Sequence, residues 1–239
     1  MLANLSHLST QSGSLGAEVH FPATSLFAIL DFVADELPRW RDRPDRPREQ
    51  SETALTSLLC AHLSSVARHS EGWDILQFRT EVPDEQQKGR KIDLAPTPCD
   101  VALCIEGRSY TDFDMLLPIE CKRLPTPKDS KRDEWEYVIH RSGSTGGIQR
   151  FKEGNHGAVH RVGAMIGYLQ ADSAPVWSTR IGSWISELAK NGEAGWSADD
   201  LLQPDRNDDV NRLATFRSSH ERKNNLPRVE LRHIWITMS

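Results

Sequence analysis

The sequence contains no apolar run that approaches the roughly 20 residues needed by a membrane-spanning helix. Residues 1–16 are polar and rich in serine, without the basic segment and apolar stretch of a secretion signal. Hydrophobic residues make up 38% of the 239 positions, which is typical of a chain that buries one sizeable core. We therefore predict a cytoplasmic globular protein.

Cysteine is scarce as well. The four cysteines are scattered, and none belongs to a CxxC pair or to a Cys/His cluster with the spacing of a zinc site. They are Cys60, Cys99, Cys104 and Cys121. This pattern excludes a zinc finger of the usual spacing and predicts reduced, mostly buried thiols.

An excess of positive charge is also absent. The formal net charge of −5 excludes a protein that coats nucleic acid non-specifically, although an enzyme could still bind nucleic acid in one cleft. The Gly/Ser-rich loop 142–147 could offer amides to an anion but lacks the lysine and spacing of a P-loop. No helix-turn-helix or other separate DNA-reading module is evident. Any sequence specificity would have to come from loops of the same domain or from a partner.

The most informative stretch that is present is Leu116–Arg123, which reads as a strand. Alternation places Glu120 and Lys122 on one face and Ile119 and Cys121 on the other, apolar face. Two charges on a half-buried strand are costly unless they are paired or bind something. A divalent cation with a phosphate would account for both, and a solvent-facing Glu-x-Lys pair is the simpler alternative.

Periodicity and turn residues predict an alternation of helices and strands around this stretch. The predicted helices are 23–37 (ended by Pro38), 49–67, one starting within 131–139, 148–152, 158–169, 177–189 and 196–202. The predicted strands are 74–82, 90–95, 101–106, 115–122 and 227–237. Residues 1–22 are predicted to be flexible and residues 23–239 to form a single domain.

Two aspartates are candidates for a second carboxylate beside Glu120. Segments 101–106 and 115–122 are predicted to be the arms of an antiparallel hairpin, which brings Asp100 opposite Glu120 and leaves Asp93 one bend further back. Asp93 stands between two aliphatic residues in a predicted strand, where aspartate is unfavourable without a reason. Metal coordination is one reason, and a turn before Pro96 is the other. Glu52, near the start of helix 49–67, either serves the site or only complements the helix dipole.

The order of Glu52 on a helix, Asp93 or Asp100 on a strand, Glu120-x-Lys122 on a strand and Gln149 on a later helix resembles the PD-(D/E)XK nuclease superfamily. Residues 49–170 carry this resemblance. It implies an α/β (α+β) restriction-endonuclease-like core, a mixed β-sheet flanked by helices, with extra helices at the C-terminal side.

The resemblance also implies residue roles. Asp93 (or Asp100), Glu120 and the backbone carbonyl of Cys121 would bind Mg²⁺, with Mn²⁺ as a substitute. Lys122 would position or activate the attacking water, Glu52 would hold a further water or cation, and Gln149 would orient the lysine or touch a phosphate. The residues expected to contact nucleic acid are Arg123, Arg150, Lys152 and His156.

The sequence departs from the superfamily pattern at three points. No proline directly precedes Asp93, and its long separation from Glu120 keeps Asp100 open. Glu153 stands where some exonuclease branches have a tyrosine. We therefore expect an endonuclease that cuts double-stranded DNA in a prokaryotic defence or mobile-element context, acting as a homodimer or with an activating partner. An RNase of the same fold and a catalytically silent binding subunit are the alternatives.

Overall fold

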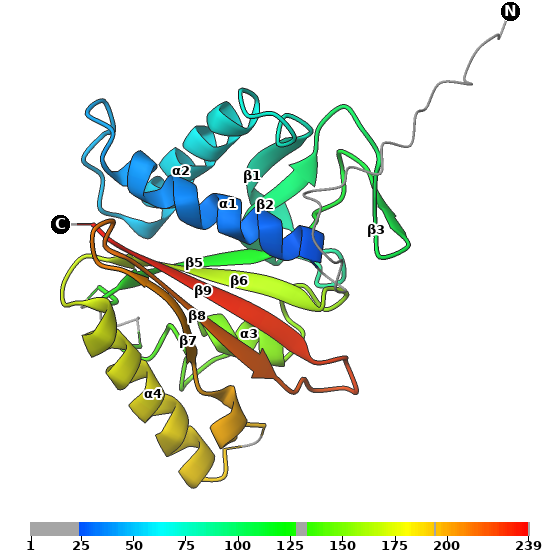
Figure 1. Ribbon diagram of the computed structural model, residues 1–239. Coiled ribbons are helices and arrows are strands. Elements are labelled where there is room, and N and C mark those ends of the chain that lie inside the picture. The colour runs from blue at the N-terminus through cyan, green and yellow to red at the C-terminus, as the bar shows by residue number, and fades with distance from the viewer. Residues whose placement is uncertain (1–23, 128–132, 194, 239) are drawn as a thin grey trace, which may run out of the picture.

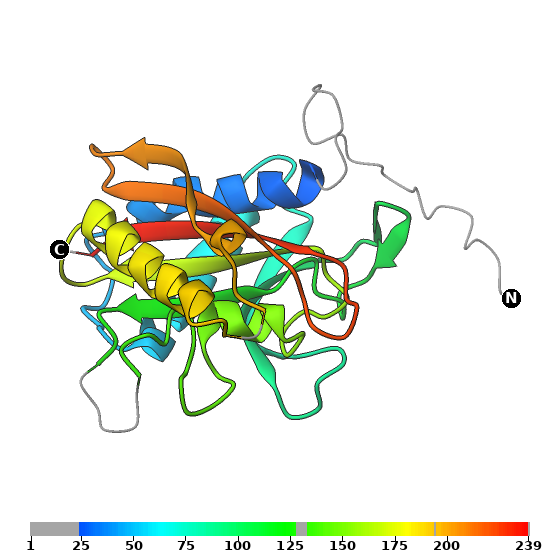
Figure 2. The same cartoon turned by 90° about the horizontal axis from the view of Figure 1, so that it is seen from below.

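A seven-stranded mixed sheet runs through the molecule, with helices on both faces (Figures 1 and 2). The computed structural model describes residues 24–127, 133–193 and 195–238. The predicted flexible segment 1–22 lies outside the described residues. The strand order is β1-β2-β5-β6-β9-β8-β7, in which β5 runs parallel to β6 and β6 parallel to β9, while the other neighbours are antiparallel.

The elements follow one another along the chain as listed here. They are α1 (Thr24–Arg41), α2 (Glu52–Ala67), β1 (Leu76–Pro83), β2 (Lys91–Pro98), β3 (Leu103–Ile105), β4 (Arg108–Tyr110), β5 (Ile119–Leu124), α3 (Gly147–Lys152), β6 (Val162–Leu169), α4 (Ala174–Lys190), the 3-10 turn η1 (Ala198–Asp200), β7 (Gln203–Asp208), β8 (Leu213–His220) and β9 (Val229–Thr237). The predicted mixed sheet flanked by helices is confirmed. Beyond β6, the C-terminal part adds three strands besides the helix α4.

Two hydrophobic cores sandwich the sheet. One contains residues of α1 and α2, and the other contains residues of α3 and α4. Strand β6 supplies both, because Ile166 and Tyr168 belong to the first core while Met165 and Leu169 belong to the second. A strand buried on both faces has no polar side, which is why this segment is apolar almost throughout.

The predicted helix 158–169 is therefore wrong, since Val162–Leu169 is strand β6. Its apolar residues at positions 162, 165, 166 and 169 match a buried helix as well as a fully buried strand, and periodicity cannot separate the two. Gly167 marks the strand instead: a Cβ there would lie 2.5 Å from Trp235 of β9, so the two strands pack closely only with glycine.

The predicted hairpin between 101–106 and 115–122 is also wrong. Strand β3 pairs with β4 through Glu106 and Gly107, which both have positive φ as a two-residue hairpin turn requires. Strand β5 pairs with β2 instead. The consequence for the site is that β2, which carries Asp93, is the strand beside Glu120.

Smaller differences concern element ends. Pro38 does not end α1, which continues to Arg41 because Trp40 is buried and the Arg41 guanidinium donates to the carbonyls of Asn211 and Thr237. Residues 134–138 form turns rather than a helix. The predicted helix 196–202 is only the short η1, and strands β7 and β8 were not predicted.

Candidate active site

The candidate site lies where β2 and β5 separate. In the described part of the chain these strands pair only at Leu94 and Ile119. Beyond this pair, a side chain takes the place of the backbone hydrogen bonds between the two strands. The Asp93 carboxylate accepts a hydrogen bond from the Cys121 amide, with Oδ2 2.9 Å from the nitrogen. This contact explains why an aspartate occupies a strand position, and it holds Asp93 beside the Glu120–Lys122 stretch.

Glu120 is completely buried and surrounded by basic side chains. The Lys122 Nζ atom lies 2.8 Å from Glu120 Oε1, the Arg150 guanidinium pairs with the same oxygen, and His156 Nδ1 lies 3.0 Å from Oε2. Burial raises the pKa of Glu120, but Lys122, His156 and Arg150 offset this and hold its pKa well below the ordinary value. Glu120 is therefore a carboxylate at neutral pH.

Lys122 is the centre of the constellation, because three carboxylates converge on its ammonium group. Its Nζ atom lies 2.8 Å from Glu120, 3.4 Å from Glu52 and 4.0 Å from Asp93. Burial lowers the pKa of Lys122, but these carboxylates raise it above the ordinary lysine value. A raised pKa favours the protonated form of Lys122, which can stabilise negative charge and orient neighbouring groups.

Glu52 enters the site from the first turn of α2, where Ser51 caps the helix. Its Oε2 atom accepts a hydrogen bond from the Arg123 amide at 2.9 Å, and its Oε1 atom faces Lys122. The two alternatives for Glu52 are thus both realised: it begins a helix and it contacts the site. The side chain is 19% exposed, so the cluster reaches the surface here.

Asp93 is the carboxylate of the cluster whose pKa is raised above its ordinary value. Burial and the neighbouring Glu120 charge raise the pKa of Asp93 to about 7, although Lys122 and the Cys121 amide act in the opposite direction. Its side chain is 32% exposed. A second positive charge placed between Asp93 and Glu120 would favour ionisation of both.

The residues present fit a magnesium ion by donor type. In the described residues no group of three His, Cys, Asp or Glu side chains is arranged to hold a metal. Mg²⁺ is commonly bound through only one or two carboxylates and keeps several waters, which matches Asp93 and Glu120 with the Cys121 carbonyl between Glu120 and Lys122. Glu120 Oε2 is buried, and its contact among the described residues is the His156 Nδ1 atom at 3.0 Å, which is not aligned as a hydrogen bond. A buried carboxylate oxygen without a well-aligned donor is the observation that favours a cation.

The structure separates the two aspartate candidates. Asp93 contacts Cys121 and faces Lys122, whereas Asp100 is exposed in the turn after β2 and has a φ of 59°. No ion pair of Asp100 is found among the described residues. Of the two aspartates, Asp93 is the one that lies beside Lys122 and the Cys121 amide.

Gln149 does not join the cluster. Its side chain ties down the loop before α3: Oε1 accepts from the amides of His140 and Gly146 at 3.1 and 3.2 Å, and Nε2 donates to the Gly143 carbonyl at 3.1 Å. A role in orienting Lys122 is not supported, since no bond between the two residues is found in the described part of the molecule. Gln149 acts as a loop anchor.

The residues predicted to contact nucleic acid divide into three groups. Arg150 and His156 lie inside the site against Glu120, a placement that the β5–α3–β6 crossover creates and that no sequence spacing signals. Lys152 is buried, pairs with Asp200 at 2.5 Å and lies over the Trp196 ring, so it offers no surface to a nucleic acid. Arg123 lines a cavity next to the site.

A second buried polar cluster lies on the α4 side of the sheet and was not predicted. It is a chain of hydrogen bonds that joins Trp235, Tyr137, His233, Ser218, His220 and Asp200, with distances between 2.6 and 2.8 Å. Its Asp200–His220–Ser218 segment has the residue types of a hydrolase triad, but all three side chains are buried. His233 also contacts the Ser218 hydroxyl oxygen, so this oxygen is not open to a substrate.

Comparison of the chain with protein-family models, curated proteins and solved structures finds no match. In addition, none of the helices in the described ranges is long and apolar enough to cross a membrane.

Proposed function

We propose that this chain is a Mg²⁺-dependent nuclease with a restriction-endonuclease-like core, and that it cuts double-stranded DNA. The observation that carries the proposal is the convergence of Glu52, Asp93 and Glu120 on Lys122 from three separate elements. Such an assembly of largely buried charge is costly to fold, and perturbed charge clusters of this kind are concentrated at functional sites, so a ligand is the explanation that we favour.

The arrangement of elements supports the same reading. Glu52 on α2, Asp93 on β2, Glu120-x-Lys122 on β5 and Gln149 on α3 occur in the order of the superfamily resemblance, in a mixed sheet flanked by helices. Gln149 has the position along the chain that the resemblance implies, but its side chain anchors a loop, and no bond from it to Lys122 is found among the described residues.

Each residue has a physical role in phosphodiester hydrolysis. Asp93, Glu120 and the Cys121 carbonyl would hold Mg²⁺, which polarises a phosphoryl oxygen when bound. The Lys122 ammonium stabilises the charge that grows on the phosphate in the transition state. Glu52 orients Lys122, and Arg150 holds the Glu120 carboxylate in place.

The proposal is tested by cleavage of supercoiled plasmid, linear duplex, single-stranded DNA and RNA, with Mg²⁺, Mn²⁺ or EDTA. We expect metal-dependent cutting of duplex DNA that Glu120→Ala and Lys122→Ala both lose. Asp100→Ala is the matched control, because it removes a carboxylate near the same strand without touching the cluster. Cleavage of RNA but not of DNA would show that RNA is the substrate.

One observation favours a silent binding subunit as the second candidate. Three basic side chains already surround Glu120 and compete with any metal. Calorimetric titration with Mg²⁺ distinguishes the two, since a silent subunit would bind nucleic acid without taking up the ion at Asp93.

A further inference from the structure

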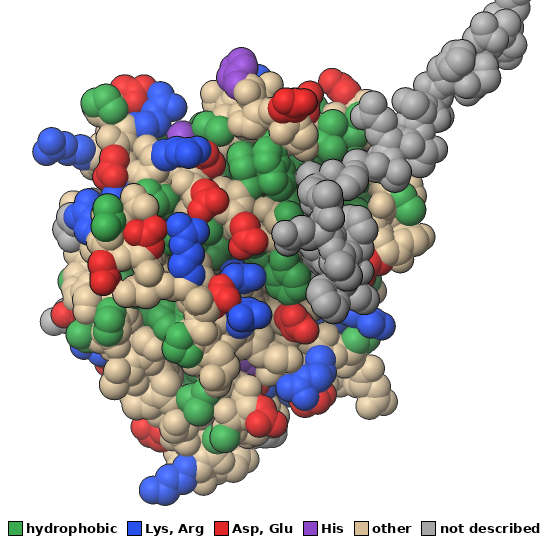
Figure 3. Space-filling view, viewed as in Figure 1, with side chains coloured by type: hydrophobic (Ala, Val, Ile, Leu, Met, Phe, Trp, Pro, Cys, Tyr) green, Lys and Arg blue, Asp and Glu red, His purple; other side chains and the backbone are tan. Residues whose placement is uncertain are grey.

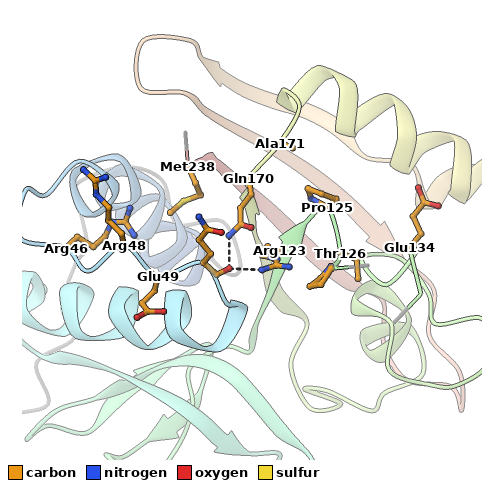
Figure 4. A pocket seen from close by; sticks show the side chains of 12 residues that line it. Arg46, Arg48, Glu49, Arg123, Pro125, Thr126, Glu134, Gln170, Ala171 and Met238 are labelled. Atoms are coloured by element: carbon orange, nitrogen blue, oxygen red, sulfur yellow. Dashed lines mark hydrogen bonds between the residues drawn. The ribbon is translucent and has the colours of Figure 1, made fainter. Parts of the chain in front are cut away.

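A cavity of about 1000 Å³ opens next to the candidate site, at the carboxyl ends of three parallel strands (Figure 4). Arg123 belongs to the end of β5, Gln170 follows β6, and Met238 follows β9, and all three line it. In open sheets with parallel strands, ligands bind in the crevice outside the carboxyl ends of the strands. The position of the cavity is therefore that of a ligand site.

Three arginines give the cavity its chemical character. In the described part of the chain, Arg46, Arg48 and Arg123 form no ion pair with any carboxylate, although Glu49 and Glu134 also line the cavity. Figure 4 shows Glu134 at the opposite side of the cavity from Arg46 and Arg48. Elsewhere on the molecule, basic and acidic side chains are interspersed on the face drawn in Figure 3. The three guanidinium groups therefore line one cavity without a carboxylate partner among the described residues.

The Arg123 guanidinium has hydrogen-bond donors that the described residues do not use. Its guanidinium donates to the Gln50 carbonyl at 3.0 Å, but its Nε atom is buried and has no hydrogen-bond partner among the described residues. Arg123 as a whole is only partly buried and lines the cavity, so the accessible part of its guanidinium can bind a charged acceptor there. Arg46 is held by stacking over the Trp40 ring, so its guanidinium is fixed in position.

The cavity and the candidate site share a wall. Arg123 directly follows Lys122, and the Glu52 carboxylate contacts both the Arg123 amide and the Lys122 ammonium. Gln50, two residues before Glu52, lines the cavity. Glu52 and Arg123 thus connect the cavity to the candidate site.

We infer that this cavity binds nucleotide phosphates through Arg46, Arg48 and Arg123. Arginine matches phosphate with paired N–H donors, and a volume of this size accommodates a nucleotide. The phosphates come either from the strand that is cut, in which case the inference rests on the proposed function, or from a free nucleotide. Both sources share the same chemistry at the arginines.

The test measures binding in EDTA, where no metal-dependent cleavage can occur. The probes are a fluorescein-labelled 12-nucleotide single strand and, separately, ATP. The variants are Arg48→Gln, Arg123→Gln and the double variant, and the matched control is Arg68→Gln, an exposed arginine at the other end of α2. Arg48→Gln is the safer variant for folding, since no bond of its side chain is found in the described residues.

We expect each substitution at Arg48 or Arg123 to weaken binding about tenfold and the control to leave it unchanged. For the single strand, the slope of log K against log salt should become shallower by about 0.7 for each lost phosphate contact. An effect on the oligonucleotide identifies the strand as the ligand, whereas an effect on ATP alone identifies a free nucleotide.

Unchanged binding of both probes by the double variant would overturn the inference. Plasmid cleavage by the wild type, measured in parallel with Mg²⁺, separates the two proposals. If the wild type cuts DNA but binding does not depend on the arginines, the proposed nuclease function is kept and the phosphate site is rejected. If binding depends on the arginines but no cleavage occurs, the phosphate site is kept and the nuclease function is rejected.

Discussion

Helix α3 sends two basic side chains to two buried acids, and these acids differ sharply in their surroundings. Arg150 reaches Glu120, where Lys122 and His156 compete for the same carboxylate and Asp93 adds a second negative charge nearby. Lys152 reaches Asp200, whose oxygens also accept from His220 and from the Ser197 amide. One cluster is crowded with charge, and the other is fully hydrogen-bonded.

The chain that ends at Asp200 has a single direction. The Trp235 indole can only donate, so the Tyr137 hydroxyl accepts from it, and when both histidines are neutral Tyr137 donates in turn to His233 Nδ1. His233 Nε2 then donates to Ser218, and Ser218 donates to His220 Nε2. His220 Nδ1 finally donates to Asp200. Every proton has one place when both histidines are neutral.

The contrast distinguishes a polar cluster that is satisfied internally from one that a ligand could complete. The Asp200 cluster is satisfied internally and needs no ligand, despite its triad-like residues. The Glu120 cluster leaves Glu120 Oε2 without a hydrogen bond and raises the pKa of Asp93 to about 7. The proposed function would account for both features by a ligand that completes the cluster.

The largest expected effect follows from breaking the satisfied cluster. Asp200→Ala leaves Lys152 and His220 buried without their acceptor, so we expect a loss of about 3–5 kcal/mol in the free energy of unfolding. Urea titration measures it, with exposed Asp199→Ala as the matched control. A loss under 1 kcal/mol would contradict the description of Asp200 as the end of a tightly coupled chain.

Acid should also break this cluster. Burial lowers the pKa of both His220 and His233. For His220, the Asp200 charge opposes this shift while Lys152 and Arg228 add to it; for His233, protonated His220 adds to it. The unfolded chain therefore takes up protons near pH 6.5 that the folded chain does not, and stability falls as pH drops below 6.5.

The expected slope is up to about 1.4 kcal/mol per pH unit for each imidazole. Urea unfolding between pH 5 and pH 7.5 measures it, and His220→Asn should flatten the curve. Equal slopes in the variant and the wild type would show that these histidines are not the groups that titrate.

Ser218→Ala tests whether the triad-like segment is only structural. The change removes the bridge between the two histidines, and we expect a loss of about 1–3 kcal/mol in stability. Because the hydroxyl is buried and already accepts a hydrogen bond, a fluorophosphonate probe should not label the wild type. Labelling that disappears in Ser218→Ala would instead identify Ser218 as a nucleophile.

The smallest expected effect concerns metal uptake by the crowded cluster. At Mg²⁺ tenfold above its dissociation constant, the ion should stabilise the wild type by about 1.4 kcal/mol. Asp93→Asn should abolish this gain, and Asp100→Asn should keep it. Thermal unfolding with and without Mg²⁺ measures both, and equal gains in all three proteins would place the ion elsewhere.

The sequence pointed to the residues of the Glu120 cluster, but it did not predict how the strands that carry them pair. Alternation in 116–123 put Glu120 and Lys122 on one face. Asp93 was singled out because an aspartate is unfavourable between two aliphatic residues of a strand. The hairpin prediction nevertheless brought Asp100 forward, because the two-residue turn at Glu106–Gly107 was missed. Pairing of β5 with β2 depends on contacts between distant segments, which local pattern does not encode.

Other errors have the same origin. The buried strand β6 imitated a helix because neighbours on both faces remove its polar side. Pro38 remains inside α1 because Trp40 and Arg41 are held by tertiary contacts. The Asp200 chain draws its members from four separate segments between residues 137 and 235, so no local sequence motif could predict it. Elements with a clear amphipathic pattern, such as α4 and β9, were predicted correctly.

The most direct test of the account is single-turnover cleavage of plasmid DNA with Mg²⁺ by the wild type, Lys122→Met and Ser218→Ala, all confirmed to be folded. The account predicts that Lys122→Met lowers the rate by about 10²–10³, while Ser218→Ala stays close to the wild type. Wild-type cleavage by Lys122→Met, or equal losses in both variants, would contradict the assignment of chemistry to the Glu120–Lys122 cluster.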